Sequence, residues 1–160
     1  MVTSLPPRLS GYRGDNYLDA GGFLFGTDRI VPPRRLREGL AELQQGSCFY
    51  CCERLSGHAI EVDHFIPWAR YPDNGVENLV LAHQRCNNAK RDFLAATPHV
   101  TNWLARFQSP DADALTRLSR EAGWESRPAQ TLGVASAIYL RLPAEVELWL
   151  APGRFEAADR

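Results

Sequence analysis

Hydrophobic residues recur at helical spacing in the segment that begins at Pro33. Leu36, Leu40 and Leu43 follow one another at i, i+4 and i+7, and Gly46 comes soon after the last leucine. This spacing places the three leucines on one face of a helix, which a proline can begin and a glycine can end. The pattern therefore predicts an amphipathic helix between the proline and the glycine.

Two short strands and a second helix are predicted in the middle of the chain. Residues 58–62 follow a Ser-Gly turn signal, and residues 79–81 form a short hydrophobic run. Both segments are typical of strands, and the stretch 68–75 separates them as a loop. A helix is expected to begin within 84–87 and to run towards residue 95. The predicted order is β, long loop, β, α.

The rest of the chain is predicted to be mainly helical. Pro98, Pro110 and Pro128 each stand at the start of a stretch with hydrophobic residues at helical spacing. Proline is common in the first turn of a helix, so we expect three further helices. Residues 145–150 alternate between polar and hydrophobic types and predict a short edge strand, after which the last residues are expected to fray.

These elements indicate an α+β fold with a small core between two flanking segments. Residues 1–32 contain five Gly and three Pro without sustained periodicity, which predicts an N-terminal arm or loop. Residues 33–95 hold the first helix, both strands and the second helix. Residues 96–160 form a mainly helical C-terminal extension. A chain of 160 residues accommodates one small domain with such extensions.

Composition and charge narrow the class of protein. Hydrophobic residues make up 44% of the chain and charged residues 23%, which is typical of a soluble globular protein. The formal net charge is −1, so any contact with DNA must use local basic patches and not global charge. The sequence has no apolar run of membrane-spanning length and no apolar signal segment near its start, so we expect no membrane contact and a cytoplasmic location.

Four metal-ligand residues occur in two pairs with the same two-residue gap. Cys48 and Cys51 form a C-x-x-C pair, and His83 and Cys86 repeat the gap 32 positions after Cys51. This gap lets a tight turn direct both side chains at one tetrahedral centre, so the pattern predicts a structural zinc site. The alternative is a set of buried thiols with an incidental histidine. Cys52 has no partner at this spacing and is either a bystander or a substitute ligand.

Between the two ligand pairs lies Asp63-His64, with Asn78 fifteen residues after the aspartate and Asn87 nine residues later. Together with the ligand pairs, these residues resemble the HNH endonucleases that carry a zinc knuckle. The resemblance implies a ββα-metal core in which Asp63 and Asn87 bind a catalytic metal ion, His64 is the general base and Asn78 fixes the loop. The family usually has cysteine where His83 stands, but histidine is also a competent zinc ligand.

The chemistry of these side chains agrees with that implication. A histidine with a pKa of about 6.5 can accept a proton from water near neutral pH. Carboxylate and amide oxygens are the ligands that Mg²⁺ prefers, and the combination suits metal-assisted phosphodiester hydrolysis. Neighbouring side chains of a regular strand point to opposite faces, so we expect the strand to bend at Asp63-His64 for both to share one site.

A structural role is the alternative for each of these polar residues. His64 would then be a core histidine bonded to a backbone carbonyl, and Asn78 a turn residue. Asn87 would cap the helix, a role that Asn88 can also fill. The aspartate beside His64 and the ligand pairs around it favour the catalytic interpretation.

Three basic residues, Arg85, Lys90 and Arg91, lie within seven residues that contain no acid. Their position on the helix that would carry a metal ligand predicts contact with nucleic-acid phosphates. Ordinary solvated surface charge is the alternative.

The sequence thus predicts an endonuclease with a structural Zn²⁺ and a catalytic Mg²⁺ or other divalent cation. The resemblance implies cleavage of DNA to 5′-phosphate and 3′-hydroxyl ends, in restriction, phage defence or phage DNA processing. By analogy, a core this small suggests a specificity partner protein or a homodimer. Two alternatives are a catalytically silent zinc module that binds nucleic acid or protein, and an RNA-cleaving nuclease.

Overall fold

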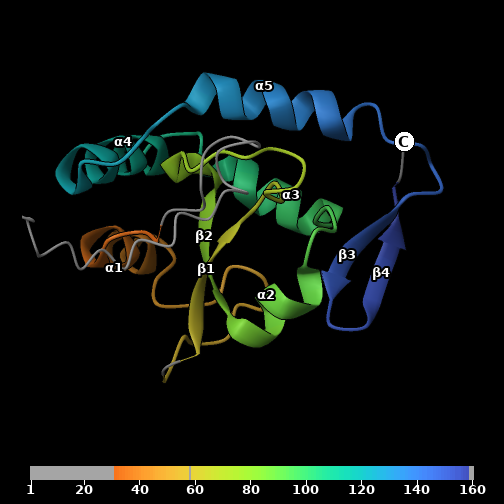
Figure 1. The fold of residues 1–160 in the computed structure, drawn as a ribbon, viewed down its shortest axis with the longest axis horizontal. Helices are drawn as coiled ribbons and strands as arrows, with labels where there is room; N and C mark the ends of the chain where they lie inside the picture. Colours follow the sequence, from red (N-terminus) through yellow and green to blue (C-terminus); the bar gives the residue numbers. More distant parts are fainter. Residues whose placement is uncertain (1–30, 58, 159–160) are drawn as a thin grey trace, which may run out of the picture.

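The centre of the fold is an antiparallel hairpin followed directly by a short helix. The computed structural model describes residues 31–57 and 59–158, so nearly all of the predicted N-terminal arm lies outside the described residues. Strand β1 (Ile60–His64) pairs with β2 (Leu79–His83), a 3₁₀ turn (η1, Val76–Asn78) leads into β2, and α2 (Gln84–Lys90) follows it (Figure 1). This is the predicted β, loop, β, α order, and the α+β fold class is confirmed.

Strand β1 continues further than the sequence indicated. The predicted strand at 58–62 was expected to bend at Asp63-His64, but the ladder runs without a register shift to the pair His64 and Leu79. The amide of Phe65 then donates to the carbonyl of Asn78 at 2.8 Å. Backbone pairing therefore holds the Asp-His pair in the strand, and the expected bend is not observed.

Helix α2 is shorter than predicted and begins differently. It ends at Lys90 and not near residue 95, because Arg91 has φ 51° and ψ −129°, which no helix can continue. His83 occupies the N-cap position. Neither Asn87 nor Asn88 caps the helix, so the capping alternative for these two residues is wrong.

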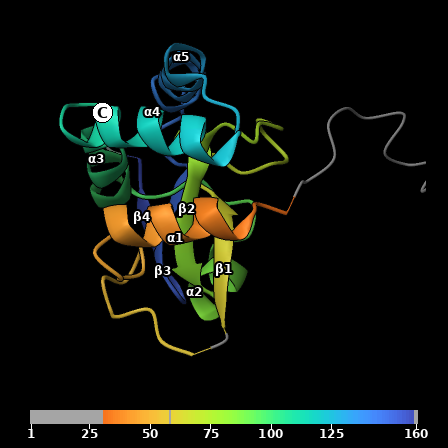
Figure 2. The same cartoon turned by 90° about the vertical axis from the view of Figure 1, so that its left-hand side faces the viewer.

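The two faces of β2 pack against different partners. Leu79 and Leu81 join a cluster with α1 (Arg34–Leu43) and α4 (Asp111–Ala122), to which the predicted Leu36 and Leu40 contribute fully buried side chains (Figure 2). The alternate residues of β2, 80 and 82, face a second cluster. This is the two-residue alternation of a strand buried on both sides.

The second cluster joins the hairpin to the C-terminal helices. It contains residues of the 48–51 turn, of α3 (Thr97–Ala105) and of α5 (Pro128–Tyr139). Phe65, directly after β1, stacks on Trp103 of α3 with ring centroids 4.7 Å apart. Both rings are fully buried. The C-terminal helices therefore form part of the core that supports β1.

A second hairpin follows α5 and closes this side of the fold. Strand β3 (Glu147–Ala151) agrees with the predicted edge strand, but it pairs with β4 (Arg154–Ala157), where the sequence was expected to fray. The amide of Trp149 donates to the carbonyl of Leu94, and the amide of Ala96 donates to the carbonyl of Trp149, both at 2.8 Å. These bonds attach β3 to the chain just after α2.

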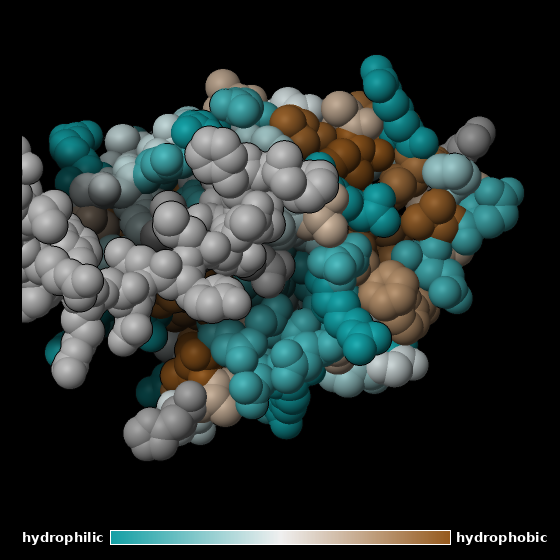
Figure 3. Space-filling model, in the orientation of Figure 1, coloured by the Kyte–Doolittle hydropathy of each residue, from teal (hydrophilic) through white to brown (hydrophobic). Residues whose placement is uncertain are grey.

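The outer surface is mainly hydrophilic on the face in Figure 3, although hydrophobic side chains gather near the C-terminal end of α5. Within residues 31–57 and 59–158, none of the helices has the length and apolar character needed to cross a membrane.

Candidate functional site

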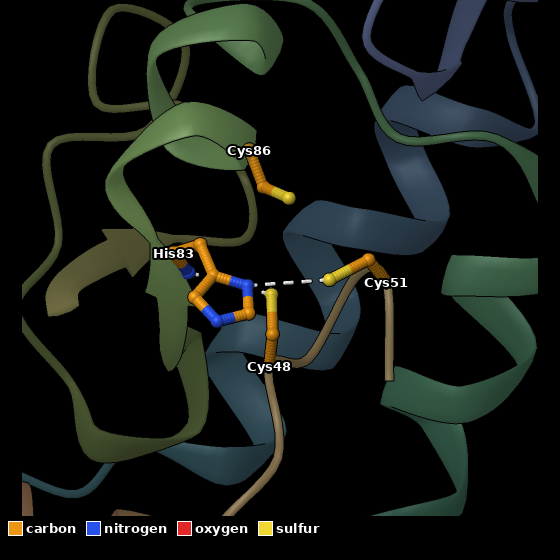
Figure 4. Close-up of side chains that lie close together, drawn as sticks. All are labelled: Cys48, Cys51, His83 and Cys86. Atoms are coloured by element: carbon orange, nitrogen blue, oxygen red, sulfur yellow. Dashed lines mark hydrogen bonds between the residues drawn. The ribbon is translucent and has the colours of Figure 1, made fainter. Parts of the chain in front are cut away.

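The four predicted zinc ligands come together in one cluster. The Sγ atoms of Cys48, Cys51 and Cys86 and a ring nitrogen of His83 all lie within 4.8 Å of one another, and the side chains point towards a common centre (Figure 4). Around a tetrahedral zinc with bonds of about 2.0 to 2.3 Å, ligand atoms lie roughly 3.5 to 3.8 Å apart. The cluster can therefore hold a metal ion such as zinc. Cys52 is exposed and takes no part in it.

The histidine of the cluster is oriented as a ligand. Its Nε2 lies 3.1 Å from the carbonyl oxygen of Arg54, and its Nδ1 lies 3.3 Å from Sγ of Cys51. When Nε2 carries the proton and donates to the carbonyl, Nδ1 directs its lone pair at the cluster. Such a bond from the second ring nitrogen is the usual companion of histidine ligation.

The protonation of the thiols also fits a cation. Burial raises the pKa of Cys51, but a hydrogen bond from the Glu53 backbone and the polar side chains around the sulfur bring it to about 7. Burial, together with the charges of Cys48 and Cys51, raises the pKa of Cys86 to about 12. Zinc binds thiolates, so its binding must release the proton of Cys86. We infer that zinc affinity decreases as the pH falls.

A cavity of about 600 Å³ brings the predicted catalytic residues together. It opens along β1 and the end of α2, and its walls include Asp63, His64 and Asn87. Asp63 and His64 are each only 8% exposed. Although they are neighbours in a paired strand, both reach this cavity while bonding to different residues.

Asp63 is held on its inner side by two donors. The hydroxyl of Tyr50 donates to Oδ2 at 2.5 Å, and Nζ of Lys90 lies 3.0 Å from the same oxygen. Burial and the nearby Asp63 charge raise the pKa of Tyr50 well above its usual value, so the phenol remains protonated and donates. Sequence reasoning missed Tyr50, whose only signal is its place between two ligand cysteines.

His64 is held by the loop that joins the strands. Its Nε2 lies 3.1 Å from Oδ1 of Asn74, and its ring packs edge-on against Trp68 with centroids 5.0 Å apart. In the tautomer that donates from Nε2 to Asn74, Nδ1 carries the lone pair that a general base needs. Nothing in the local sequence distinguishes Asn74 as the partner of this histidine.

The linker between α4 and α5 fixes the loop that carries Asn74. The indole of Trp124 donates to the Asn74 carbonyl at 2.6 Å, and the amide of Val76 donates to the carbonyl of Glu125 at 2.9 Å. The Arg127 guanidinium lies 3.2 Å from the carboxylate of Asp73, which is buried. The linker between these helices thus positions Asn74, which in turn contacts His64.

Asn78 lies in this loop as a buried structural residue. Its Oδ1 accepts from the amide of Ile66 at 2.8 Å, and its Nδ2 donates to the Ile66 carbonyl at 3.2 Å and the Asp73 carbonyl at 3.4 Å. The side chain is fully buried and does not line the cavity. It can act on catalysis only by holding the loop.

Asn87 is oriented by a glutamate that sequence reasoning missed. Its Nδ2 donates to Oε2 of Glu61 at 2.5 Å, and Gln84 donates to the other oxygen of the same carboxylate at 2.9 Å. With Nδ2 engaged, Oδ1 is the atom of Asn87 that a cation can use. Glu61 precedes Asp63 by two positions, so strand alternation could have placed both on one side of β1.

The predicted phosphate contacts divide into three cases. Lys90 was wrongly placed on the surface: it is fully buried, since it follows the buried Cys86 by four residues on the inner face of α2. Arg85 is exposed and pairs with Glu53. Arg91 is exposed and lines the cavity, as does Arg37, and neither forms an ion pair within the described parts of the chain.

Comparison with known proteins agrees with this arrangement over part of the chain. Residues 48–96 match the family described as HNH endonuclease, which confirms the resemblance for that segment. Among solved structures, the Type II-C Cas9 enzyme from Actinomyces naeslundii is similar, with 28% identity and a TM-score of 0.40. The match covers 62% of this chain and 12% of that enzyme. No curated protein matches the chain.

We predict that Cys86→Ser abolishes zinc binding and lowers the melting temperature, because the metal and the fold stabilise each other. The matched control is Cys52→Ser, which removes an exposed thiol outside the cluster. Elemental analysis should find one zinc per chain in the parent and the control, and none in Cys86→Ser. A Cys86→Ser protein that retains zinc and melts like the parent would contradict the assignment.

Proposed function

We propose that this protein is a metal-dependent endonuclease that hydrolyses phosphodiester bonds in DNA. The observation that carries the proposal is the convergence of Asp63, His64 and Asn87 on one cavity, within the segment that matches the HNH endonucleases. A carboxylate, an imidazole and an amide oxygen are what metal-assisted hydrolysis needs at one place. The cavity also carries two arginines suited to phosphate.

The oxygen donors at this cavity fit a magnesium ion. Asp63 and Asn87 would hold it, because protein partners engage Oδ2 of Asp63 and Nδ2 of Asn87, and Oδ1 of each side chain suits a hard cation. Glu61, which bonds to Asn87, adds a second carboxylate to the same wall. When bound there, the ion would offset the negative charge that develops on the phosphate and the departing oxygen.

The protein residues supply the proton transfer and the positioning. His64 would take a proton from the attacking water at Nδ1, while Asn74 keeps the ring in the required tautomer and orientation. Arg91 and Arg37 stand at the cavity wall, where they can bind the phosphates that flank the scissile bond. The buried Lys90 acts from beneath the site, on Asp63.

A cellular role, a partner and a location are proposed as well. We propose a role in restriction, phage defence or phage DNA processing, with a specificity partner or a second copy of the chain. We place the protein in the cytoplasm, because the thiols of the cluster must stay reduced to bind zinc. The RNA-cleaving alternative uses the same base and cation, so substrate comparison must decide between the two.

We predict that His64→Ala lowers the rate of supercoiled plasmid nicking by about 10² to 10⁴, the usual effect of removing a general base. Cleavage by the parent should require Mg²⁺ and stop with EDTA. Single-stranded DNA and RNA, tested in parallel, identify the preferred substrate. A His64→Ala protein that is folded, contains zinc and cuts at the parental rate would overturn the proposal and favour a silent zinc module.

The metal ligands should respond differently from the base. Asn87→Ala should be partly rescued by excess Mg²⁺, whereas His64→Ala should not. Asp63→Ala is a poor test, because it also leaves the buried Lys90 ammonium without its carboxylate. Breaking a buried ion pair on one side costs about 3 to 5 kcal/mol of stability, so lost activity could reflect unfolding.

We predict that Arg85→Gln and Arg91→Gln each weaken duplex binding without changing sequence preference. Each lost phosphate contact should reduce the slope of log affinity against log salt by about 0.9. Arg141→Gln, a charge removal at an exposed position that does not line the cavity, is the control and should leave the slope unchanged. Fluorescence anisotropy with EDTA present measures binding without cleavage. An unchanged slope in both variants would assign these arginines to ordinary surface.

A further inference from the structure

Tyr50 connects the metal-binding turn to the carboxylate of the candidate active site. It lies between the ligands Cys48 and Cys51, yet its hydroxyl donates to Oδ2 of Asp63 at 2.5 Å. The side chain is 6% exposed. A residue from the turn that carries two ligands of the Cys/His cluster therefore contacts Asp63, a proposed ligand of the second metal ion.

Aromatic neighbours fix the ring of Tyr50 and so fix the position of its hydroxyl. It meets His99 and Trp149 edge-on, with centroid distances of 5.3 and 5.2 Å, and it packs in the same way against Phe49 at 5.3 Å. The amide of Phe49 donates to the carbonyl of Leu81 in β2 at 3.0 Å. The hydroxyl is thus fixed by three aromatic contacts and by backbone pairing of the neighbouring residue.

The hydroxyl acts on the same oxygen of Asp63 as the buried ammonium. Nζ of Lys90 lies 3.0 Å from Oδ2 and also 3.0 Å from the carbonyl oxygen of His64. Two donors on one oxygen fix the rotation of the carboxylate and leave Oδ1 as its ligand atom. With the ammonium alone, the carboxylate could turn both oxygens towards it, which would compete with a cation in the cavity.

We propose that Tyr50 is a positioning residue that orients Asp63 to bind a divalent cation through Oδ1. This inference rests on the proposed function, because it takes Asp63 as a ligand of the catalytic ion. It gives the Cys/His cluster a role beyond stability, since the turn that carries two of its ligands also sets the geometry of the second metal site.

The test compares Tyr50→Phe with Tyr139→Phe. Each variant loses one phenolic hydroxyl and keeps its ring. The Tyr139 hydroxyl donates to the Ala95 carbonyl at 3.1 Å and not to Asp63, so it controls for the loss of a hydrogen bond. Zinc-loaded proteins are titrated with Mn²⁺ in the absence of DNA, and free Mn²⁺ is followed by its electron paramagnetic resonance signal. Elemental analysis and melting curves are recorded for each protein.

We expect Tyr50→Phe to bind Mn²⁺ about 10- to 100-fold more weakly than the parent, as is usual when a partner of a metal ligand is removed. Zinc content should remain at one per chain, and Tyr139→Phe should bind Mn²⁺ like the parent. If Tyr50→Phe binds Mn²⁺ like the parent while Asn87→Ala binds it more weakly, the positioning role of Tyr50 is overturned and the proposed metal site is retained. A parent protein that binds no Mn²⁺ would overturn both this inference and the proposed metal site.

Discussion

The hairpin and helix that carry the candidate site are too short to be stable alone. β1 and β2 have five residues each and α2 has seven. A two-stranded hairpin is marginal in water at best, and an isolated helix of this length does not form. Their order must therefore come from contacts with the rest of the chain. The positions of Asp63, His64 and Asn87 depend on those contacts.

Three sets of contacts meet this need. The Cys/His cluster ties the 48–51 turn to the junction of β2 and α2, and a bound metal would make that connection strong. Helices α1 and α4 cover one face of β2, while α3, α5 and β3 cover the other. The linker before α5 holds the loop over His64. The regions outside the family match thus serve to hold the site in shape.

We interpret the buried pair of Lys90 and Asp63 as serving the proposed function more than stability. Removing two charges from water is expensive, and a buried ion pair is often no better for stability than packed hydrophobic side chains. The pair also lies under the cavity, where the carboxylate is a proposed metal ligand. The ammonium is then a fixed partner that orients the carboxylate of Asp63.

The candidate ligands and catalytic residues, which the structure brings together, were easier to find in the sequence than their partners. The Cys/His pairs and Asp63-His64 have spacings that a metal site or a reaction centre requires. Such spacings can be recognised from the sequence alone. Tyr50 and Asn74 act through contacts 10 or more residues away in the chain, and any tyrosine or asparagine would look the same. Lys90 was misassigned because charge suggested the surface, although its helical spacing from Cys86 pointed inward.

The elements that were predicted correctly are those whose signals are local in the sequence. The leucine spacing of α1 and the prolines before the later helices are local signals, and those helices are present. Strand β4 and the end of α2 depend on tertiary context. β4 exists because β3 offers it an edge, and α2 stops because Arg91 turns the chain towards the Leu94 and Trp149 pairing.

The most direct test of the account is to locate both metal ions in crystals of the zinc-loaded protein soaked in MnCl₂. Anomalous diffraction at the zinc and manganese edges distinguishes the two elements. The account predicts a zinc peak among Cys48, Cys51, His83 and Cys86, and a separate manganese peak between Asp63 and Asn87. Manganese bound elsewhere, with neither Asp63 nor Asn87 as a ligand, would contradict the proposed active site.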